Sequence, residues 1–231
     1  MQKWLQKTHC MKTKTSISTK PHIHTLLLFP DMNPLRPVYL AVLAAAYTLN
    51  CANAAKGNDA DPMELEISQN IESPAVPRKL HKAITANIKA NRDKLTKNGY
   101  SVKVIRNGEA MEITIPCDEL FAPNDTVLHP EKLKGLLPYL HQPQLYKMLV
   151  AVHSDNTGSR EYADALTESR VSAIADYLIQ ASGGNDDILL VPYAQGMDEP
   201  LTSNDRRENR RKNRRVEIYL IPDKPLFKRL K

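Results

Sequence analysis

The hydrophobic positions in the middle of the chain follow first the spacing of a helix and then that of two strands. Residues 79–97 place leucine and isoleucine at near-helical intervals, which is typical of an amphipathic helix. Residues 101–106 and 109–116 are rich in β-branched residues, and Asn107-Gly108 between them favours a tight hairpin turn. We therefore expect a helix followed by a β-hairpin.

Further along, the hydrophobic spacing predicts helices that alternate with strands. Residues 130–141 carry leucines on one helical stripe, and residues 145–152 form a short apolar run that suits a strand buried on both faces. Residues 159–181 repeat apolar positions at the steps of a long helix. A strand, a short helix and a last strand are expected at 188–193, 204–212 and 216–221. This order predicts an α/β sheet covered by helices, with parallel strands where a helix crosses over.

The N-terminal part of the chain has the pattern of an export signal. Arg36 precedes an apolar run over residues 38–49, and small residues follow it. This order of a positive charge, an apolar run and small residues is typical of a secretory signal peptide, and the run is shorter than the roughly 20 residues that span a bilayer. We expect translation to start at Met32, with a long and unusual leader from Met1 as the alternative.

Two processing events remain open at the end of this signal. Ala52-Asn53-Ala54 is an AxA cleavage site, which we favour. Cys51 could instead carry a lipid, although Thr48 and Asn50 stand where a lipoprotein signal normally has Leu and a small residue. In both cases the chain leaves the cytoplasm, so we expect no nucleic-acid partner.

Composition agrees with one ordinary domain and adjoining segments. The chain has 231 residues, of which 42% are hydrophobic and 25% are charged, as in average globular proteins. We expect a targeting segment at 1–54, with its signal peptide at 32–54, and a polar tether at 55–78. An introductory helix and strand at 79–108, the main domain at 109–222 and a basic tail at 223–231 are expected to follow.

Charge and cysteine content restrict the candidate chemistry. The formal net charge is +6, and residues 206–215 alone hold seven basic side chains. Such a cluster could bind phosphates, but blocks of like charge are usually a solvated helix face, which we favour for an exported chain. Three cysteines without a CxxC pair, and histidines without metal-ligand spacing, predict neither a metal site nor a cofactor.

The candidate site lies in the stretch HSDNTGSREYADALTESR, residues 153–170. Asp155 follows the predicted buried strand, where α/β folds usually bind ligands, although it could merely make the turn or cap the helix. Arg170 lies four residues after Leu166 and four before Ile174, on the apolar stripe of the helix. A buried guanidinium requires a carboxylate or ligand as partner.

This stretch resembles the HTDxxG…LSxxR motif of the OmpA-like C-terminal peptidoglycan-binding domains, the family of OmpA, the peptidoglycan-associated lipoprotein and the flagellar stator wall anchor. Residues 213–218, NRRVEI, reproduce a further family signature, and residues 120–128 resemble the family's LFxxxSxxL segment. The three motifs occur in the family's order over residues 109–222. The departures are small and leave the ligand-facing charges in place: they are Val152, Ser154, Ala163 and Thr167.

The resemblance implies a two-layer α/β (α+β) sandwich of order βαβαββ with a mixed parallel and antiparallel sheet, here preceded by a helix and an extra hairpin strand. It also implies non-covalent binding of peptidoglycan, in which Asp155 pairs with the ammonium of diaminopimelate and Arg170 with its carboxylate. One fixed anion and one fixed cation suit a zwitterion. Further candidate contacts are Asn156, Thr157, Asn124 and Arg214. Of the neighbours Arg214 and Arg215 we favour Arg214, since alternation sends them to opposite faces.

The resulting expectation is a wall anchor without catalytic activity, in the periplasm and associated with the outer membrane of a Gram-negative bacterium. A lipid on Cys51 or an outer-membrane protein would connect it to that membrane. Two other functions stay open: a periplasmic protein-interaction module that no longer binds the wall, and a wall-processing enzyme. The enzyme is the weaker alternative, because Asp155 has no evident acidic partner for glycoside hydrolysis.

Overall fold

The computed structural model describes residues 65–72, 74–141, 146–183 and 188–231. Its contacts divide the chain into two units, Met1–Asn58 and Asp59–Lys231, and every described residue belongs to the second. The predicted signal peptide, Cys51 and most of the expected tether lie outside the described residues. Among the helices that are described, none is both long enough and apolar enough to cross a bilayer.

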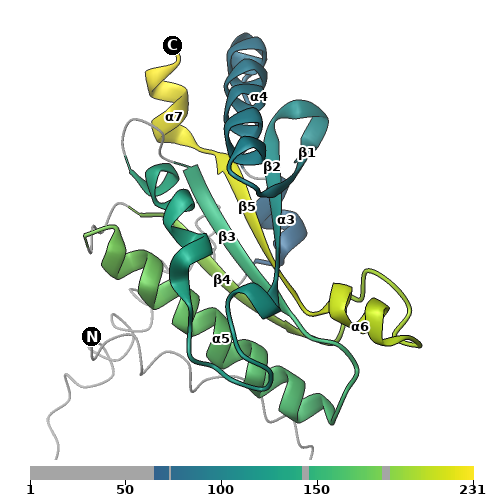
Figure 1. Cartoon of the computed structure of the whole chain (residues 1–231). Coiled ribbons are helices and arrows are strands. Elements are labelled where there is room, and N and C mark those ends of the chain that lie inside the picture. Colours follow the sequence, from purple (N-terminus) through teal and green to yellow (C-terminus); the bar gives the residue numbers. More distant parts are fainter. Residues whose placement is uncertain (1–64, 73, 142–145, 184–187) are drawn as a thin grey trace, which may run out of the picture. The chain divides into compact units, whose positions relative to one another are not determined.

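A five-stranded mixed sheet forms the centre of the second unit (Figure 1). Its order is β1-β2-β5-β3-β4, and the only parallel pair within it is β3 with β4; the other three pairs are antiparallel. The bounds of the strands are β1 Ser101–Ile105, β2 Ala110–Pro116, β3 Tyr146–His153, β4 Leu190–Gly196 and β5 Arg215–Pro222. The predicted α/β class and the mixed sheet are confirmed. From β2 onward the chain follows the expected order βαβαββ, except that a short helix, α6 at Arg207–Asn213, lies between the last two strands.

Two helical segments connect the inner strands. Helix α5, Arg160–Ala181, crosses from β3 to β4 and makes them parallel; Ser159 caps it by accepting a hydrogen bond from the amide of Tyr162 at 3.2 Å. The segment η5, Pro130–Leu140, is a 3₁₀ helix with Pro138 inside it. A proline has no amide hydrogen to donate, so the predicted helix is present but does not follow the regular α-helical pattern.

The elements before the domain take the predicted form of a helix and a hairpin. Helix α4, His81–Lys97, follows a short 3₁₀ turn, η2 at Arg78–Leu80. The hairpin turns through η3, Arg106–Gly108, where Asn107 adopts a φ of 52° and Gly108 a φ of 95°. Asparagine and glycine tolerate this left-handed backbone better than other residues, which explains why Asn107-Gly108 was a good turn signal. A further 3₁₀ turn, η4 at Cys117–Glu119, follows β2.

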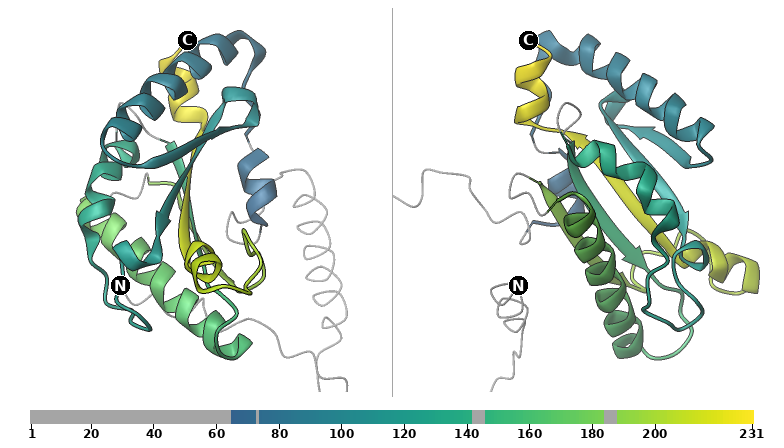
Figure 2. Two further views of the ribbon diagram at one scale, coloured as in Figure 1. Left: turned by 45° about the vertical axis from the view of Figure 1, so that its right-hand side comes forward. Right: turned by 60° about the vertical axis from the view of Figure 1, so that its left-hand side comes forward.

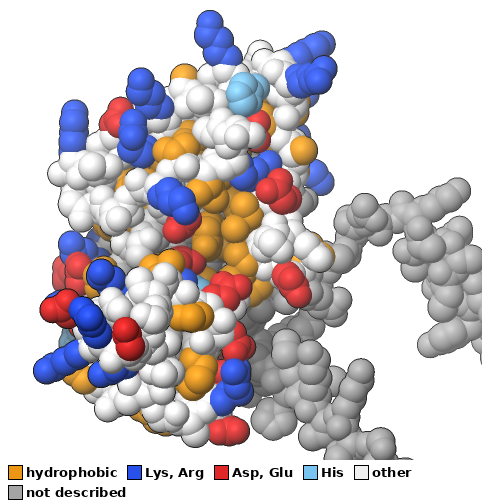
Figure 3. Space-filling view, turned by 90° about the vertical axis from the view of Figure 1, so that its right-hand side faces the viewer, with side chains coloured by type: hydrophobic (Ala, Val, Ile, Leu, Met, Phe, Trp, Pro, Cys, Tyr) orange, Lys and Arg blue, Asp and Glu red, His pale blue; other side chains and the backbone are white. Residues whose placement is uncertain are grey.

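Each face of the sheet has its own apolar cluster. The larger cluster joins the sheet to α4, η5, α5 and the C-terminal helix. The smaller lies on the other face, where Ile67 and Ile71 of helix α3, Ile67–Glu72, pack against it. The left view of Figure 2 shows α3 across the sheet from α4 and α5. In Figure 3, which looks at the molecule from the α3 side, hydrophobic side chains gather in a hollow bordered by charged ones.

Two expected segments outside the domain are more ordered than the sequence indicated. Part of the tether forms α3, which is attached by hydrogen bonds from Lys147 Nζ to the Asn70 carbonyl at 3.1 Å and from the Tyr193 hydroxyl to the Leu65 carbonyl at 2.7 Å. Residues 223–231, expected as a basic tail, include helix α7, Lys224–Arg229. Its Leu226 and Phe227 are buried in the larger cluster, so burial of apolar area holds this segment against the sheet.

Candidate functional site

The candidate site lies at one edge of the sheet, where three neighbouring strands have their ends. Pro116 at the end of β2 pairs with Arg215 at the start of β5, and Val152 near the end of β3 pairs with Val216. The loops after β2 and β3 and the chain entering β5 therefore meet. Asp155 lies two residues beyond the end of β3.

Asp155 is a buried carboxylate with two hydrogen-bond donors. Its side chain is 4% exposed. Oδ1 accepts from the Thr157 amide at 2.8 Å, and Oδ2 lies 2.6 Å from Arg214 Nη1. Burial raises the pKa of Asp155, but the hydrogen bonds from Thr157 and Arg214 outweigh it, and the pKa lies below its usual value. The group is therefore ionised at neutral pH.

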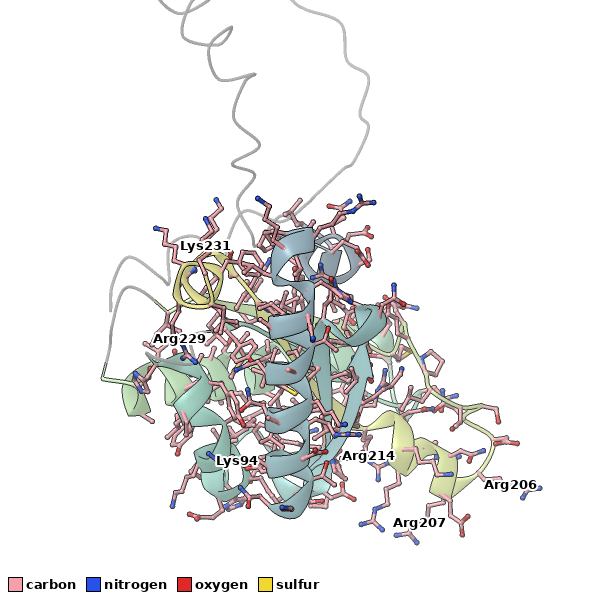
Figure 4. The ribbon with its side chains drawn as sticks, turned by 90° about the horizontal axis from the view of Figure 1, so that it is seen from above. Lys94, Arg206, Arg207, Arg214, Arg229 and Lys231 are labelled. Atoms are coloured by element: carbon pink, nitrogen blue, oxygen red, sulfur yellow. The ribbon has the colours of Figure 1, made fainter. Side chains whose placement is uncertain are left out.

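Arg214 lies between two carboxylates. It follows the last residue of helix α6, Arg207–Asn213, and leads into β5. Besides its ion pair with Asp155, its Nε lies 3.8 Å from Oδ1 of Asp118, whose other oxygen binds Arg211 Nε at 3.1 Å. Figure 4 shows Arg214 at the inner end of α6, and Arg206 and Arg207 at its outer end.

Arg170 is almost completely buried and is held by a loop. The residue is 4% exposed. Its Nε donates to the Asp125 carbonyl at 2.9 Å and its Nη2 to the Ala122 carbonyl at 3.3 Å, while the guanidinium carbon lies 4.9 Å from the centre of the Phe121 ring. The contact with the ring is a cation–π interaction. No side-chain carboxylate within the described ranges forms an ion pair with Arg170.

The buried thiol of Cys117 is influenced by the charges of both Arg170 and Arg214. Burial raises the pKa of Cys117 to about 11, while the positive charges of Arg170 and Arg214 act to lower it. Its Sγ lies 3.9 Å from the carbonyl of His153 at the end of β3. Arg170 and Arg214 thus act on the same thiol, and Arg214 binds Asp155. The sequence-predicted pair occupies one edge of the sheet, but Asp155 and Arg170 each have their own partners.

The other sequence-predicted contacts lie around this edge. Asn156, Thr157 and Asn124 are exposed, and Asn124 adopts a positive φ of 58°. Of the two neighbouring arginines, Arg214 is the one beside Asp155. Arg215 instead binds the buried Glu217 at 2.6 Å.

Two contributors to the site were missed in the sequence. Asp118 was not considered, and Phe121 was noted only as part of a motif. Asp118 lies two residues after the end of β2, which is a weak signal, and its partner Arg211 is 93 residues further along. The backbone carbonyls that hold Arg170 have no sequence signal at all, because every residue carries one.

The departures from the family motif are accommodated by the packing. Val152, Ala163 and Thr167 are all fully buried. The hydroxyl of Thr167 donates to the Ala163 carbonyl at 2.9 Å and accepts from the Gly196 amide at 3.2 Å, which ties α5 to the end of β4. Gly196 adopts a positive φ of 51°, a backbone conformation that favours glycine.

The described part of the chain contains no group of three or more His, Cys, Asp and Glu side chains arranged to hold a metal ion. What the edge offers is one buried anion and one buried cation, with a second cation, Arg214, bound to the anion. Such an arrangement can bind a small charged group and orient it. Residues 120–214, which include Asp155, Arg170 and Arg214, match the sequence model of the OmpA family. The candidate site therefore lies within the part of the chain that resembles the OmpA family.

Curated proteins are similar to part of the chain. The chain is 29% identical over 134 residues to "Probable lipoprotein YiaD" of Escherichia coli, a match that covers 57% of this chain and 59% of the relative. It is 31% identical over 116 residues to "Peptidoglycan-associated lipoprotein" of Legionella pneumophila, covering 48% of this chain and 65% of that protein. The match thus spans less than two thirds of the length of either relative.

A solved structure has the same fold. The crystal structure of a putative MotB-like protein from Desulfovibrio vulgaris aligns with a TM-score of 0.52 and 20% sequence identity, over 62% of this chain and 99% of that one. At this identity the likeness concerns the fold alone. It agrees with the mixed sheet and the helices that pack against it.

Proposed function

We propose that residues 109–222 form an OmpA-like domain that binds peptidoglycan without covalent attachment, through the diaminopimelate of the wall peptide. Asp155 would pair with the ammonium group of this zwitterion, and Arg170 with its carboxylate. The observation that carries the proposal is the pair of buried, opposite charges at one edge of the sheet. The name of the Legionella relative, a peptidoglycan-associated lipoprotein, supports the same ligand.

The electrostatics of the edge suit this ligand. Asp155 is ionised at neutral pH because Thr157 and Arg214 stabilise its charge. The contacts described for Arg170 are two neutral carbonyls and an aromatic ring, which orient its guanidinium without neutralising it. A ligand carboxylate would supply the missing counter-charge, and a planar guanidinium binds a carboxylate well.

The proposed setting is the periplasm, where the domain would connect the outer envelope to the wall. The link to the outer membrane would be a lipid on Cys51 or an outer-membrane protein. We propose binding alone and no catalytic step. Incubation of the protein with purified sacculi is then expected to release no soluble muropeptides, and a release of such fragments would instead indicate a wall-processing enzyme.

The direct test is co-sedimentation of the protein with purified sacculi. Asp155→Asn and Arg170→Ala are each expected to weaken binding at least about 30-fold, since losing one partner of a buried charge contact costs about 2–5 kcal/mol. The matched control is Arg160→Ala. Arg160 lies at the start of α5, the helix that carries Arg170, and its exposed guanidinium pairs with Asp198. Circular dichroism verifies that each variant is folded.

The result that contradicts the proposal is equally clear. If folded Asp155→Asn and Arg170→Ala proteins sediment with sacculi as the parent does, the site is not the one described here. If the unmodified protein does not sediment with sacculi but binds another periplasmic protein, the result would instead support the protein-interaction module.

A further inference from the structure

We propose that Arg214 competes with the ammonium group of the ligand for Asp155, and that this competition determines which ligands the site accepts. The inference rests on the proposed function, because it concerns the same carboxylate. The sequence suggested that Arg214 contacts the ligand directly. The proposed role is different: Arg214 occupies Asp155 until the ligand displaces it.

The contacts of Asp155 leave little room for an additional cation. One carboxylate oxygen accepts from the Thr157 amide, and the other lies 2.6 Å from Arg214 Nη1. The whole residue is only 3% exposed, so the approach to these oxygens from solvent is narrow. An ammonium that binds Asp155 must therefore take the position of the Arg214 guanidinium.

Arg214 has a second carboxylate within reach. Its Nε is 3.8 Å from Oδ1 of Asp118, and the Arg214 side chain is 32% exposed while that of Asp118 is 39% exposed. Rotation of the Arg214 side chain toward Asp118 would exchange one ion pair for another without exposing a buried charge. Because the Arg214 carbonyl accepts from the Cys117 amide at 3.0 Å, the backbone is fixed and the movement is confined to the side chain.

This exchange selects for ligands with both charges. A ligand with an ammonium group replaces the guanidinium at Asp155 and keeps the buried carboxylate paired. A ligand in which the amine is acetylated cannot do so, and it gains only the contact with Arg170. Burying Asp155 without any cation would be costly, so Arg214 remains in place and the acetylated ligand, which has lost its ammonium group, is disfavoured. Arg214 thereby sharpens the discrimination that Asp155 and Arg170 begin.

The competition has a measurable effect on affinity. When the binding-competent arrangement is only a fraction of the population, the apparent dissociation constant rises by the reciprocal of that fraction. Removal of the competing guanidinium should therefore tighten binding of an amine-bearing ligand. Removal of Asp118, which receives Arg214 after the exchange, should weaken it.

The experiment uses titration calorimetry of the full chain with free meso-diaminopimelate and, separately, with its N,N′-diacetylated form, in which neither amine can carry a charge. Arg214→Met keeps the apolar part of the side chain and is expected to bind diaminopimelate about 5- to 10-fold more tightly than the parent. Asp118→Asn is expected to bind it about threefold more weakly, and to have no effect in the Arg214→Met background. The control Arg160→Met is expected to behave as the parent.

A stability measurement separates this role from a structural one. Arg214→Met leaves Asp155 with one partner fewer, so its melting temperature should fall while its affinity rises. A purely structural arginine would lower both, and a direct ligand contact would lower the affinity. Weaker or unchanged binding by folded Arg214→Met therefore overturns the competition alone, provided that Asp155→Asn abolishes binding. If the parent and Asp155→Asn bind diaminopimelate equally, or neither binds, both the competition and the proposed function are overturned.

Discussion

Glu217 shows how strongly a few neighbours can hold a charge inside this domain. It lies on β5 and accepts from the Tyr219 hydroxyl at 2.5 Å and from Arg215 Nε at 2.6 Å, and His153 Nε2 lies 3.3 Å away. Burial raises the pKa of Glu217, but His153, Tyr219 and Arg215 together lower it to about 2. This cluster fixes the strand that begins beside the candidate site.

The ionised Glu217 predicts a specific loss of stability in acid. Its pKa in the folded protein lies below the value of about 4.3 expected in the unfolded chain, so its contribution is complete above that pH and is lost as the pH falls toward about 2. Glu217→Gln should be less stable than the parent by about 2–3 kcal/mol at pH 7. The difference should shrink between pH 4.5 and pH 2, as measured by urea unfolding. A difference that stays constant over this range would contradict the assignment.

Sequence reasoning found charged residues of the site better than it found their partners. Arg170 could be placed at a buried position because Leu166 and Ile174 fix the helical stripe on which it lies, and the structure buries it. Its partners are carbonyls of a loop and the Phe121 ring, which depend on how that loop folds. The ion pair between Asp155 and Arg214 joins residues 59 positions apart, and only the pairing of β3 with β5 brings them together.

Among the elements, those with a long or distinctive pattern were predicted well. Helix α5 extends over 22 residues, so its apolar stripe repeats many times, and the Asn107-Gly108 turn has a direct conformational reason. Helices α3 and α7 have six residues each, too few for a period to be visible. Both are held mainly by tertiary contacts, as most short helices are, and their charged residues made them resemble a tether and a tail.

Helix α7 predicts that the end of the chain stabilises the domain. Phe227 is buried to 6% exposure, and its replacement by alanine should lower the free energy of unfolding by about 3 kcal/mol, because the lost apolar contacts leave a cavity. Val127→Ala is the matched control, since Val127 is 61% exposed and should change stability by less than about 0.5 kcal/mol. Equal denaturation midpoints for Phe227→Ala and the parent would show that α7 does not contribute.

At the scale of the molecule, positive charge is concentrated beside the candidate site. Helix α6 and its flanks carry Arg206, Arg207 and Lys212, all exposed, and no ion pair involving them occurs among the described residues. Wall peptides carry free carboxylates, so these side chains should attract the wall over a distance. Such an effect would act on the rate of association more than on the final contacts.

Reversal of this charge should slow association with the wall. The double variant Arg206→Glu, Arg207→Glu is expected to associate with sacculi about tenfold more slowly at low salt, with the difference disappearing near 0.5 M salt as the charges are screened. The control is the double variant Lys94→Glu, Arg229→Glu. It changes the net charge by the same amount, but on α4 and α7 instead of beside α6 (Figure 4). Equal rates for the two double variants would show that only net charge matters.

The attachment of α3 to the sheet determines where tension on the preceding chain would enter the domain. A pull applied before Leu65 meets Tyr193 of β4 and Lys147 of β3 first, through the hydrogen bonds that fasten α3. These side-chain bonds can break one after another, whereas the backbone ladder of β3 has to shear as a unit. Detachment of α3 would lengthen the chain by tens of ångströms, at about 3.5 Å for each residue released. In the proposed setting, mechanical strain between two layers of the envelope would thus be relieved by detachment of α3 before the backbone pairing of β3, the strand that leads to Asp155, had to break.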